Sequence, residues 1–182
     1  MNLPIDPAEL TTEDIGQKRL TLNMAHDEAI EHVRRVCEES GFGIPVEFSP
    51  SELLREKVGS ERDPYYVLGA CNPEMADRAL DVTNDIGALF PCNVIVHEVE
   101  PGVQEVYHVS IMKIARLVGM APDDEDWEAI VADTSKLVER AFADLESSES
   151  EVETDPEKPR GGQGGKREGR GQAPGSETGG SE

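Results

Sequence analysis

The segment DPYYVLGACNPE, residues 63–74, joins a strand-like run directly to a helix start. Its first part is rich in aromatic and branched apolar residues, which favour a β-strand. Asn72 then stands at the N-cap position, Pro73 at the first helical position and Glu74 in the first turn, so these three residues suit the beginning of a helix. Because no loop separates the two elements, this segment predicts a chain that alternates strands and helices.

The same kinds of signal predict the other elements of the chain. We expect further strands over residues 17–23, 42–48, 91–99 and 104–111, and helices over residues 25–41, 49–59, 72–81, 112–119 and 122–146. The last two strands flank the turn-like sequence EPGV and are expected to form a hairpin. We therefore predict an α+β fold, a two-layer α/β sandwich in which helices pack on one face of a single mixed sheet of about five strands.

The helix predicted over residues 25–41 has a clear apolar face. Ile30, Val33 and Cys37 recur at helical spacing, and Gly41 suits the left-handed conformation that ends many helices. Unpaired cysteines usually behave as small buried apolar residues. Cys37 is therefore predicted to be part of the core.

The composition divides the chain into three parts. Residues 1–16 are expected to form a loose arm or a short helix, and residues 17–147 the α/β domain. Residues 148–182 hold 9 of the 17 glycines and no aromatic residue. Such a segment cannot bury enough apolar surface to offset the entropy lost on ordering, so we predict a disordered, solubilising C-terminal tail.

A formal net charge of −21 restricts the partners that this chain can have. It repels nucleic acids and anionic membranes. No apolar run approaches the roughly 20 residues that span a bilayer, and the N-terminus lacks the basic start and apolar core of a signal peptide. We expect a cytoplasmic protein that binds neither nucleic acid nor membrane. Its acidic composition, with 6 Lys against 11 Arg, is halophile-like.

Three stretches of the chain resemble the family called domain of unknown function 302. They are residues 21–48, residues 65–80 and residues 86–98, and the likeness extends in order over roughly residues 20–145. The resemblance implies a small two-layer α/β domain that pairs as a homodimer, and it implies no established reaction. His97 departs from the family pattern, in which an aromatic residue such as tyrosine is expected.

Two Cys-Asn pairs, Cys71-Asn72 and Cys92-Asn93, are the main candidates for chemistry. Cys71 precedes a helix start, where free amides and the helix dipole favour a thiolate, so one hypothesis is a reactive thiol or a soft-metal ligand. The alternative, which we favour, is that both cysteines are buried strand ends. In that case Asn72 and Asn93, our candidate binding residues, form local hydrogen bonds.

The arrangement of the two strands decides whether these cysteines can meet. Cys92 shares strand parity with Val94 and is expected to face the core. If the strands that hold Cys71 and Cys92 are parallel neighbours, the two residues lie about 20 Å apart, too far for a disulfide. An antiparallel arrangement leaves a disulfide open. Three cysteines in a reducing compartment argue against a disulfide framework.

The hairpin predicts a second candidate site. If Gly102 and Val103 form a type II′ turn, His97 stands opposite His108, with Cβ atoms about 5 Å apart. Two such imidazoles on a solvent or dimer face can hold a metal ion or haem when a third ligand arrives. The alternative is two half-exposed histidines, and a shift of register by one residue removes the pair.

These observations lead to an expectation about function. We expect an uncharacterised, homodimeric protein that binds a small ligand or a partner, with no cofactor assigned and no demonstrated catalysis. Two alternatives stay open: a thiol or sulfur-handling protein that uses Cys71, with Cys92 as the second candidate, and a metal or haem binder that uses His97 and His108. The glycines match neither a phosphate loop nor a dinucleotide motif.

Overall fold

The computed structural model describes residues 7–152, which form two layers. One layer is a five-stranded sheet of order β1-β5-β4-β3-β2, formed by β1 (Lys18–Leu22), β2 (Gly43–Phe48), β3 (Tyr65–Cys71), β4 (Cys92–Glu100) and β5 (Val103–His108). Every adjacent pair is antiparallel. The predicted two-layer α+β class and its strands are confirmed, while the sheet is antiparallel throughout instead of mixed.

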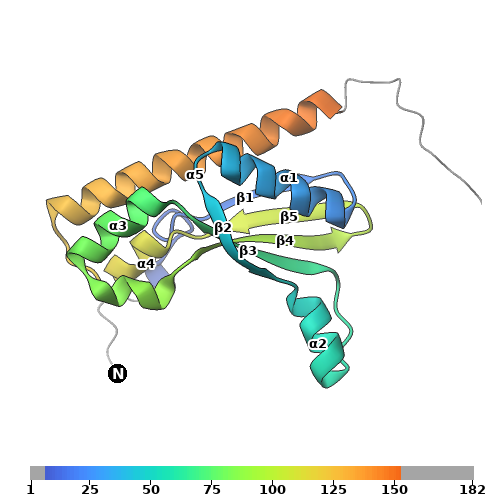
Figure 1. The fold of residues 1–182 in the computed structure, drawn as a ribbon, viewed down its shortest axis with the longest axis horizontal. Coiled ribbons are helices and arrows are strands. Elements are labelled where there is room, and N and C mark those ends of the chain that lie inside the picture. Colours follow the sequence, from blue (N-terminus) through green and yellow to red (C-terminus); the bar gives the residue numbers. More distant parts are fainter. Residues whose placement is uncertain (1–6, 153–182) are drawn as a thin grey trace, which may run out of the picture.

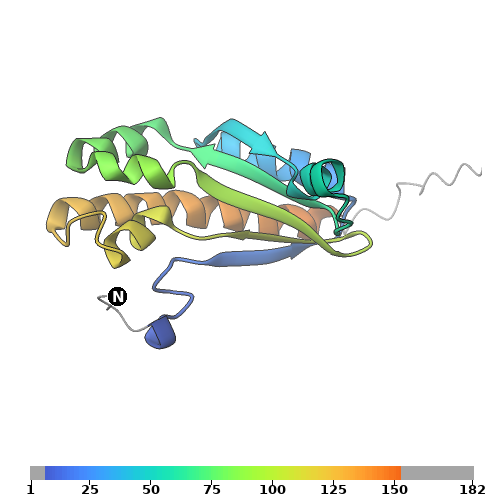
Figure 2. The ribbon, with the colours of Figure 1, turned by 90° about the horizontal axis from the view of Figure 1, so that it is seen from below.

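The second layer consists of helices. They are α1 (His26–Glu39), α2 (Pro50–Val58), α3 (Pro73–Val82), α4 (Ile111–Leu117) and α5 (Glu125–Val152), together with the short 3₁₀ helices η1 (Pro7–Glu9) and η2 (Asn84–Leu89). α1 and α5 run along one face of the sheet, while α2 projects away from the body (Figure 1). Seen from below, the central part of the sheet lies in front of α1 and α5, so its opposite face is open (Figure 2). Among the residues described, no helix combines the length and apolar character needed to cross a membrane.

The predicted helix boundaries are explained by their caps. The Asn72 side chain accepts a hydrogen bond from the Met75 amide at 3.0 Å and so begins α3. Ser49 caps α2 in the same way. Gly41, just after α1, has a φ of +89°, a conformation that glycine adopts without the steric cost other residues incur.

The core has two parts. The larger part lies between the sheet and helices α1 and α5, and it contains Cys37, only 4% exposed, as predicted. The smaller part surrounds Trp127 of α5, which packs on α3, η2 and α4. Trp127 is fully buried, and its Nε1 donates to the Met112 carbonyl at 3.0 Å.

The β4–β5 turn differs from the predicted one. Pro101 and Gly102 occupy the turn between the paired residues Glu100 and Val103, and Gly102 has a φ of +79°. Proline suits the first turn position because its φ is fixed near −65°, and glycine suits the second because a positive φ is needed there. The predicted turn at Gly102 and Val103 is therefore wrong by one residue.

The register of the hairpin separates the two predicted metal ligands, because an extra residue in β4 adds to the changed turn. A further irregularity lies between positions 98 and 100, and along the rest of the hairpin His97 pairs with Glu105 while His108 pairs with Val94. Because neighbouring residues of a strand face opposite ways, His108 joins the core face and His97 the open face. The predicted His97–His108 pair is wrong.

The connection between β3 and β4 also corrects an expectation. The two strands are antiparallel, with Cys92 opposite Ala70. α3 and η2 double back between them, so the chain re-enters the sheet at the end where it left (Figure 1). The parallel arrangement considered from the sequence is wrong, and so is the separation of about 20 Å between Cys71 and Cys92 that followed from it. All three cysteines are free.

The ends of the chain were predicted only in part. α5 continues to Val152, past the expected helix end at residue 146 and into the segment expected to be a tail. The rest of the predicted tail, residues 153–182, lies outside the described residues, as do residues 1–6 of the predicted arm.

Candidate functional site

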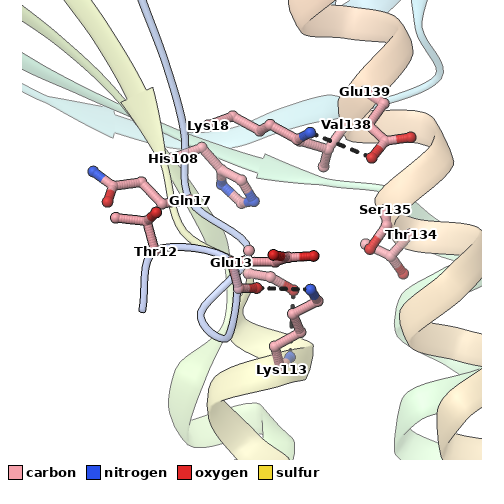
Figure 3. Close-up of a pocket in the computed structure, with 12 residues that line it drawn as sticks. Thr12, Glu13, Gln17, Lys18, His108, Lys113, Thr134, Ser135, Val138 and Glu139 are labelled. Atoms are coloured by element: carbon pink, nitrogen blue, oxygen red, sulfur yellow. Dashed lines mark hydrogen bonds and ion pairs between the residues drawn. The ribbon is translucent and has the colours of Figure 1, made fainter. Parts of the chain in front are cut away.

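A polar cleft of about 340 Å³ lies between the N-terminal segment and α5 (Figure 3). Its walls come from residues 12–17, the start of β1, the junction of β5 with α4, and the middle of α5. A concave space of this size suits a small molecule. Three parts of the chain that are distant in sequence thus meet around one space.

The N-terminal wall is held against α4 by specific bonds. The Ser110 amide donates to the Ile15 carbonyl at 2.9 Å, and Lys113 Nζ donates to the Glu13 carbonyl at 2.9 Å. Gly16 has a φ of +60°, and a Cβ placed on it would lie 2.9 Å from Ser110 Cβ. Glycine is therefore required for the segment to pass so close to the start of α4.

His108 forms part of the floor of the cleft. Its side chain is 3% exposed, and its Nδ1 lies 3.1 Å from the Asn93 carbonyl. A carbonyl only accepts, so Nδ1 must carry the hydrogen and donate. Burial lowers the pKa of His108 from its ordinary value of 6.5, so the ring is neutral at neutral pH. Nε2 then presents a lone pair, for which the described residues provide no partner.

Thr134 faces the same space from α5 (Figure 3). It is 4% exposed, and its hydroxyl has no hydrogen-bond partner among the described residues. A buried polar group without a partner costs about 1–3 kcal/mol. The cleft is thus lined by a hydroxyl without a partner on the α5 side and by an imidazole on the opposite, β5 side (Figure 3).

The upper walls of the cleft carry both signs of charge. Lys18 Nζ lies 3.3 Å from Glu139 Oε1, an ion pair between side chains that are 39% and 58% exposed. Lys113 bonds a carbonyl, and its positive charge also acts on the nearby Asp14 carboxylate, whose pKa is lowered first by the bonds from Thr11 and then by Lys113. The Glu13 carboxylate projects into the gap between its segment and α5, and no ion pair or hydrogen bond engages it within the part of the chain described (Figure 3).

The cysteines have environments that suppress thiolate formation. Burial raises the pKa of Cys37 to about 12 and that of Cys92 to about 12, with the neighbouring Cys71 adding to the second shift. Burial also raises the pKa of Cys71 from its ordinary value of 9.0. The helix start after Cys71 therefore does not produce the low thiol pKa that a reactive cysteine needs. Cys71 and Cys92 lie at strand ends, as expected, but they are half-buried instead of buried.

The two asparagines act differently from one another. Asn72 uses both ends of its amide, accepting from the Met75 amide and donating to the Gly41 carbonyl at 2.9 Å. Asn93 contributes its backbone carbonyl to His108, while its side chain is exposed. The predicted local hydrogen bonding is confirmed for the Asn72 side chain.

His97 belongs to a cluster on the open face of the sheet. Its ring lies 5.1 Å from that of Tyr65, whose hydroxyl is 2.5 Å from the Tyr107 hydroxyl. Arg19 lies over the Tyr107 ring at 4.6 Å and forms an ion pair with Glu105. Burial, and then the bond to Tyr107, raises the pKa of Tyr65. Over the described residues, no three His, Cys, Asp or Glu side chains are placed to hold a metal ion.

The cleft was not predicted from the sequence. Thr134 lies at helical spacing from Ile130 and Val138, and its hydroxyl on this otherwise apolar helix face was the available signal. Lys18 and Lys113 are two of only six lysines, yet they are 95 positions apart. Their meeting depends on the path of the N-terminal segment, which no local pattern encodes.

Comparison with known proteins gives one family. The model of the family described as "Domain of unknown function DUF302" matches residues 18–145. Among solved structures, the chain is similar to the crystal structure of an uncharacterized conserved protein DUF302 from Bacillus stearothermophilus, with a TM-score of 0.61 and 24% identity, covering 71% of this chain and 97% of that chain. At that identity the likeness concerns the fold alone. No curated protein matches the chain.

Proposed function

The chain belongs to the DUF302 family, and we propose that it is a homodimeric binding protein whose small ligand occupies the cleft between the N-terminal segment and α5. One observation supports this above others: Thr134 and His108 both line the cleft and are almost fully buried, and the Thr134 hydroxyl has no hydrogen-bond partner among the described residues. Buried polar groups in folded proteins are nearly always hydrogen-bonded. A bound molecule that supplies a partner accounts for the Thr134 hydroxyl.

A function based on a reactive thiol has weaker support. The pKa values of Cys37, Cys71 and Cys92 are all raised by burial, so each thiol is protonated at neutral pH. A protonated thiol is a poor nucleophile and a poor metal ligand. Binding without thiol chemistry therefore fits the environment of these residues better.

We base the homodimer on α2 and its surroundings. None of the residues of α2 is buried, and an isolated helix of this length is marginal in water, so α2 needs a surface to pack on. Leu53 of α2 is 48% exposed and Val58 is 68% exposed. The adjoining strand β2 adds Phe48, which is 49% exposed. A second copy of the chain that covers this arm buries these side chains.

The open face of the sheet continues the same surface. Phe48 pairs with Val67, Val67 with Ile95, and Ile95 with Tyr107, so these residues form one cross-strand row. Side chains in such a row contact one another on one face of the sheet. The row leads from the arm toward the centre of this face, but Val67 and Ile95 are only 6% and 8% exposed, so the proposed interface is centred on α2 and the end of β2.

The ligand-binding part of the proposal is tested by NMR on the full chain. The ¹⁵N-labelled protein is titrated with a mixture of L-serine, glycerate, glucose and adenosine, and backbone amide shifts are followed. We expect shifts at Gly16, Ser110 and Ser135, and we expect their loss in Ser135→Trp, which fills the cleft without changing the core. Shifts elsewhere, or none at all, contradict a ligand site in the cleft.

A further inference from the structure

We propose that the cleft selects a small zwitterion of the amino-acid type, with its carboxylate on Lys113, its ammonium on Glu13, and a side-chain hydroxyl or amide on His108 and Thr134. This rests on the proposed function and adds the chemical class of the ligand. The four groups come from three separate parts of the chain and all line one cleft.

The charges on the walls suit a ligand that carries both signs. Lys18 and Glu139 already neutralise one another at 3.3 Å. Lys113 and Glu13 remain, and the bond between them joins the ammonium to the Glu13 backbone carbonyl rather than to its carboxylate. An ammonium has three donors, so Lys113 keeps two for a ligand. One cationic and one anionic group are therefore available in the same space.

The floor suits a hydrogen-bond donor on the ligand. His108 Nδ1 donates to the Asn93 carbonyl, which leaves Nε2 as an acceptor. The Thr134 hydroxyl, without a partner among the described residues, can both donate and accept. A ligand hydroxyl or amide can supply a donor for Nε2 or a partner for the Thr134 hydroxyl, whereas a purely apolar side chain leaves both groups unpaired.

The volume limits the size of this ligand. In liquid water each molecule occupies about 30 Å³. The cleft, with a volume of about 340 Å³, therefore holds roughly eleven atoms of similar size. Free amino acids with short polar side chains fall within this limit.

The charge of the whole chain disfavours the competing classes. With a formal net charge of −21, the protein repels a multiply charged anion as it approaches. A simple cation is attracted over long distances but meets Lys18 and Lys113 inside the cleft. A zwitterion carries no net charge and can still form charge-assisted hydrogen bonds at both of its ends.

Calorimetric titration of the full chain with four matched probes tests this assignment. L-serine, glycerate, ethanolamine and glycerol share a hydroxymethyl group and differ in charge: a zwitterion, an anion, a cation and a neutral molecule. We expect L-serine to bind at least about tenfold more tightly than the other three, because each loses a charge-assisted bond worth about 1.5–3 kcal/mol. Ser135→Trp should abolish that binding.

The variant Glu13→Gln identifies the ammonium site. Its side chain has no structural bond among the described residues, so the substitution should not change folding. We expect L-serine to bind at least about tenfold more weakly to Glu13→Gln, while glycerate binding stays equal or improves.

The outcomes separate the two proposals. Equal binding of L-serine and glycerate, no effect of Glu13→Gln, or failure of L-serine to bind overturns the zwitterion assignment. If glycerate or glycerol binds instead, and Ser135→Trp prevents it, the cleft remains a ligand site and only the assigned class is wrong. If Ser135→Trp leaves binding of every probe unchanged, both proposals fail.

Discussion

Thr134 of α5 and His108 of β5 line one cleft, and they are only 4% and 3% exposed. The threonine hydroxyl has no partner among the described residues, and the imidazole uses one nitrogen on the Asn93 carbonyl. Burying polar groups without partners opposes folding. The cleft therefore lowers the stability of the empty protein, as expected for a site completed by a ligand.

Acid should destabilise the protein through His108. Its pKa in the folded state is below the ordinary 6.5, so the unfolded chain binds more protons once the pH falls below that value. The contribution of His108 to the free energy of unfolding is complete above about pH 6.5. This stabilising contribution is lost as the pH falls through 6.5 toward the lower pKa of the folded state. We expect the unfolding free energy, measured by urea titration, to decrease between about pH 7 and 5.

The contribution of His108 can be separated from that of His32. His32 also has a lowered pKa, first from burial and then from Arg35. His108→Asn keeps a donor for the Asn93 carbonyl and removes the titrating ring, so it should flatten the slope over this range more than His32→Asn does. An equal slope in both variants contradicts the assignment.

Gly16→Ala should loosen the N-terminal wall of the cleft. The new Cβ meets Ser110 Cβ at 2.9 Å, and the φ of +60° costs an alanine about 1–2 kcal/mol in addition. Gly59→Ala is the matched control, because Gly59 has a φ of +66° and nothing lies within 4 Å of its Cβ position. Thermal unfolding should show a greater loss for Gly16→Ala, and only this variant should weaken L-serine binding.

In the native, reduced protein all three thiols should react slowly with an alkylating reagent. Cys37 and Cys92 have pKa values of about 12, and the pKa of Cys71 is raised above 9.0. We expect Cys71, which is partly exposed, to react first, with a midpoint above pH 9.0, and the other two to react only on unfolding. Peptide mapping by mass spectrometry reads each site. A Cys71 midpoint well below pH 9.0 revives the thiol hypothesis.

Leu53→Glu should weaken the proposed dimer by about tenfold or more, since it places a charge on a surface that dimerisation buries. Val118→Glu is the control, because Val118 is similarly exposed, at 53%, but lies after α4. Analytical ultracentrifugation at two ionic strengths measures the self-association of wild type and of both variants. Salt should favour self-association by screening the repulsion between copies of net charge −21. A monomeric wild type contradicts the dimer.

Much of the fold could be predicted because its signals are local. Asn72 and Ser49 have the side chains that cap helices, and Ile30, Val33 and Cys37 repeat at the period of one helix face. Each signal lies within a few residues of the structure it determines. Similar reasoning placed every strand of the sheet.

The errors arose where distant elements decide the outcome. The β4–β5 register depends on the Pro101–Gly102 turn and on the irregularity between Glu98 and Glu100, and that one extra residue puts His97 and His108 on opposite faces. The antiparallel β3–β4 pair depends on η2 turning back against α3, which periodicity does not reveal. Predicting the cleft would have needed the correct β4–β5 register, the antiparallel β3–β4 pair and the path of the N-terminal segment. Its residues were therefore recognisable only in three dimensions.

The most direct test compares the unfolding free energies of wild type and Thr134→Val, with and without L-serine. We predict that, without ligand, the unfolding free energy of Thr134→Val is about 1–3 kcal/mol higher than that of wild type. L-serine should raise the unfolding free energy of Thr134→Val less than that of wild type. Ser40→Ala is the control: Ser40 is also buried with an unpartnered hydroxyl over the described residues but lies outside the cleft, so it should gain stability and keep the full effect of L-serine. If Thr134→Val is stabilised by L-serine as much as wild type is, the cleft is not the ligand site.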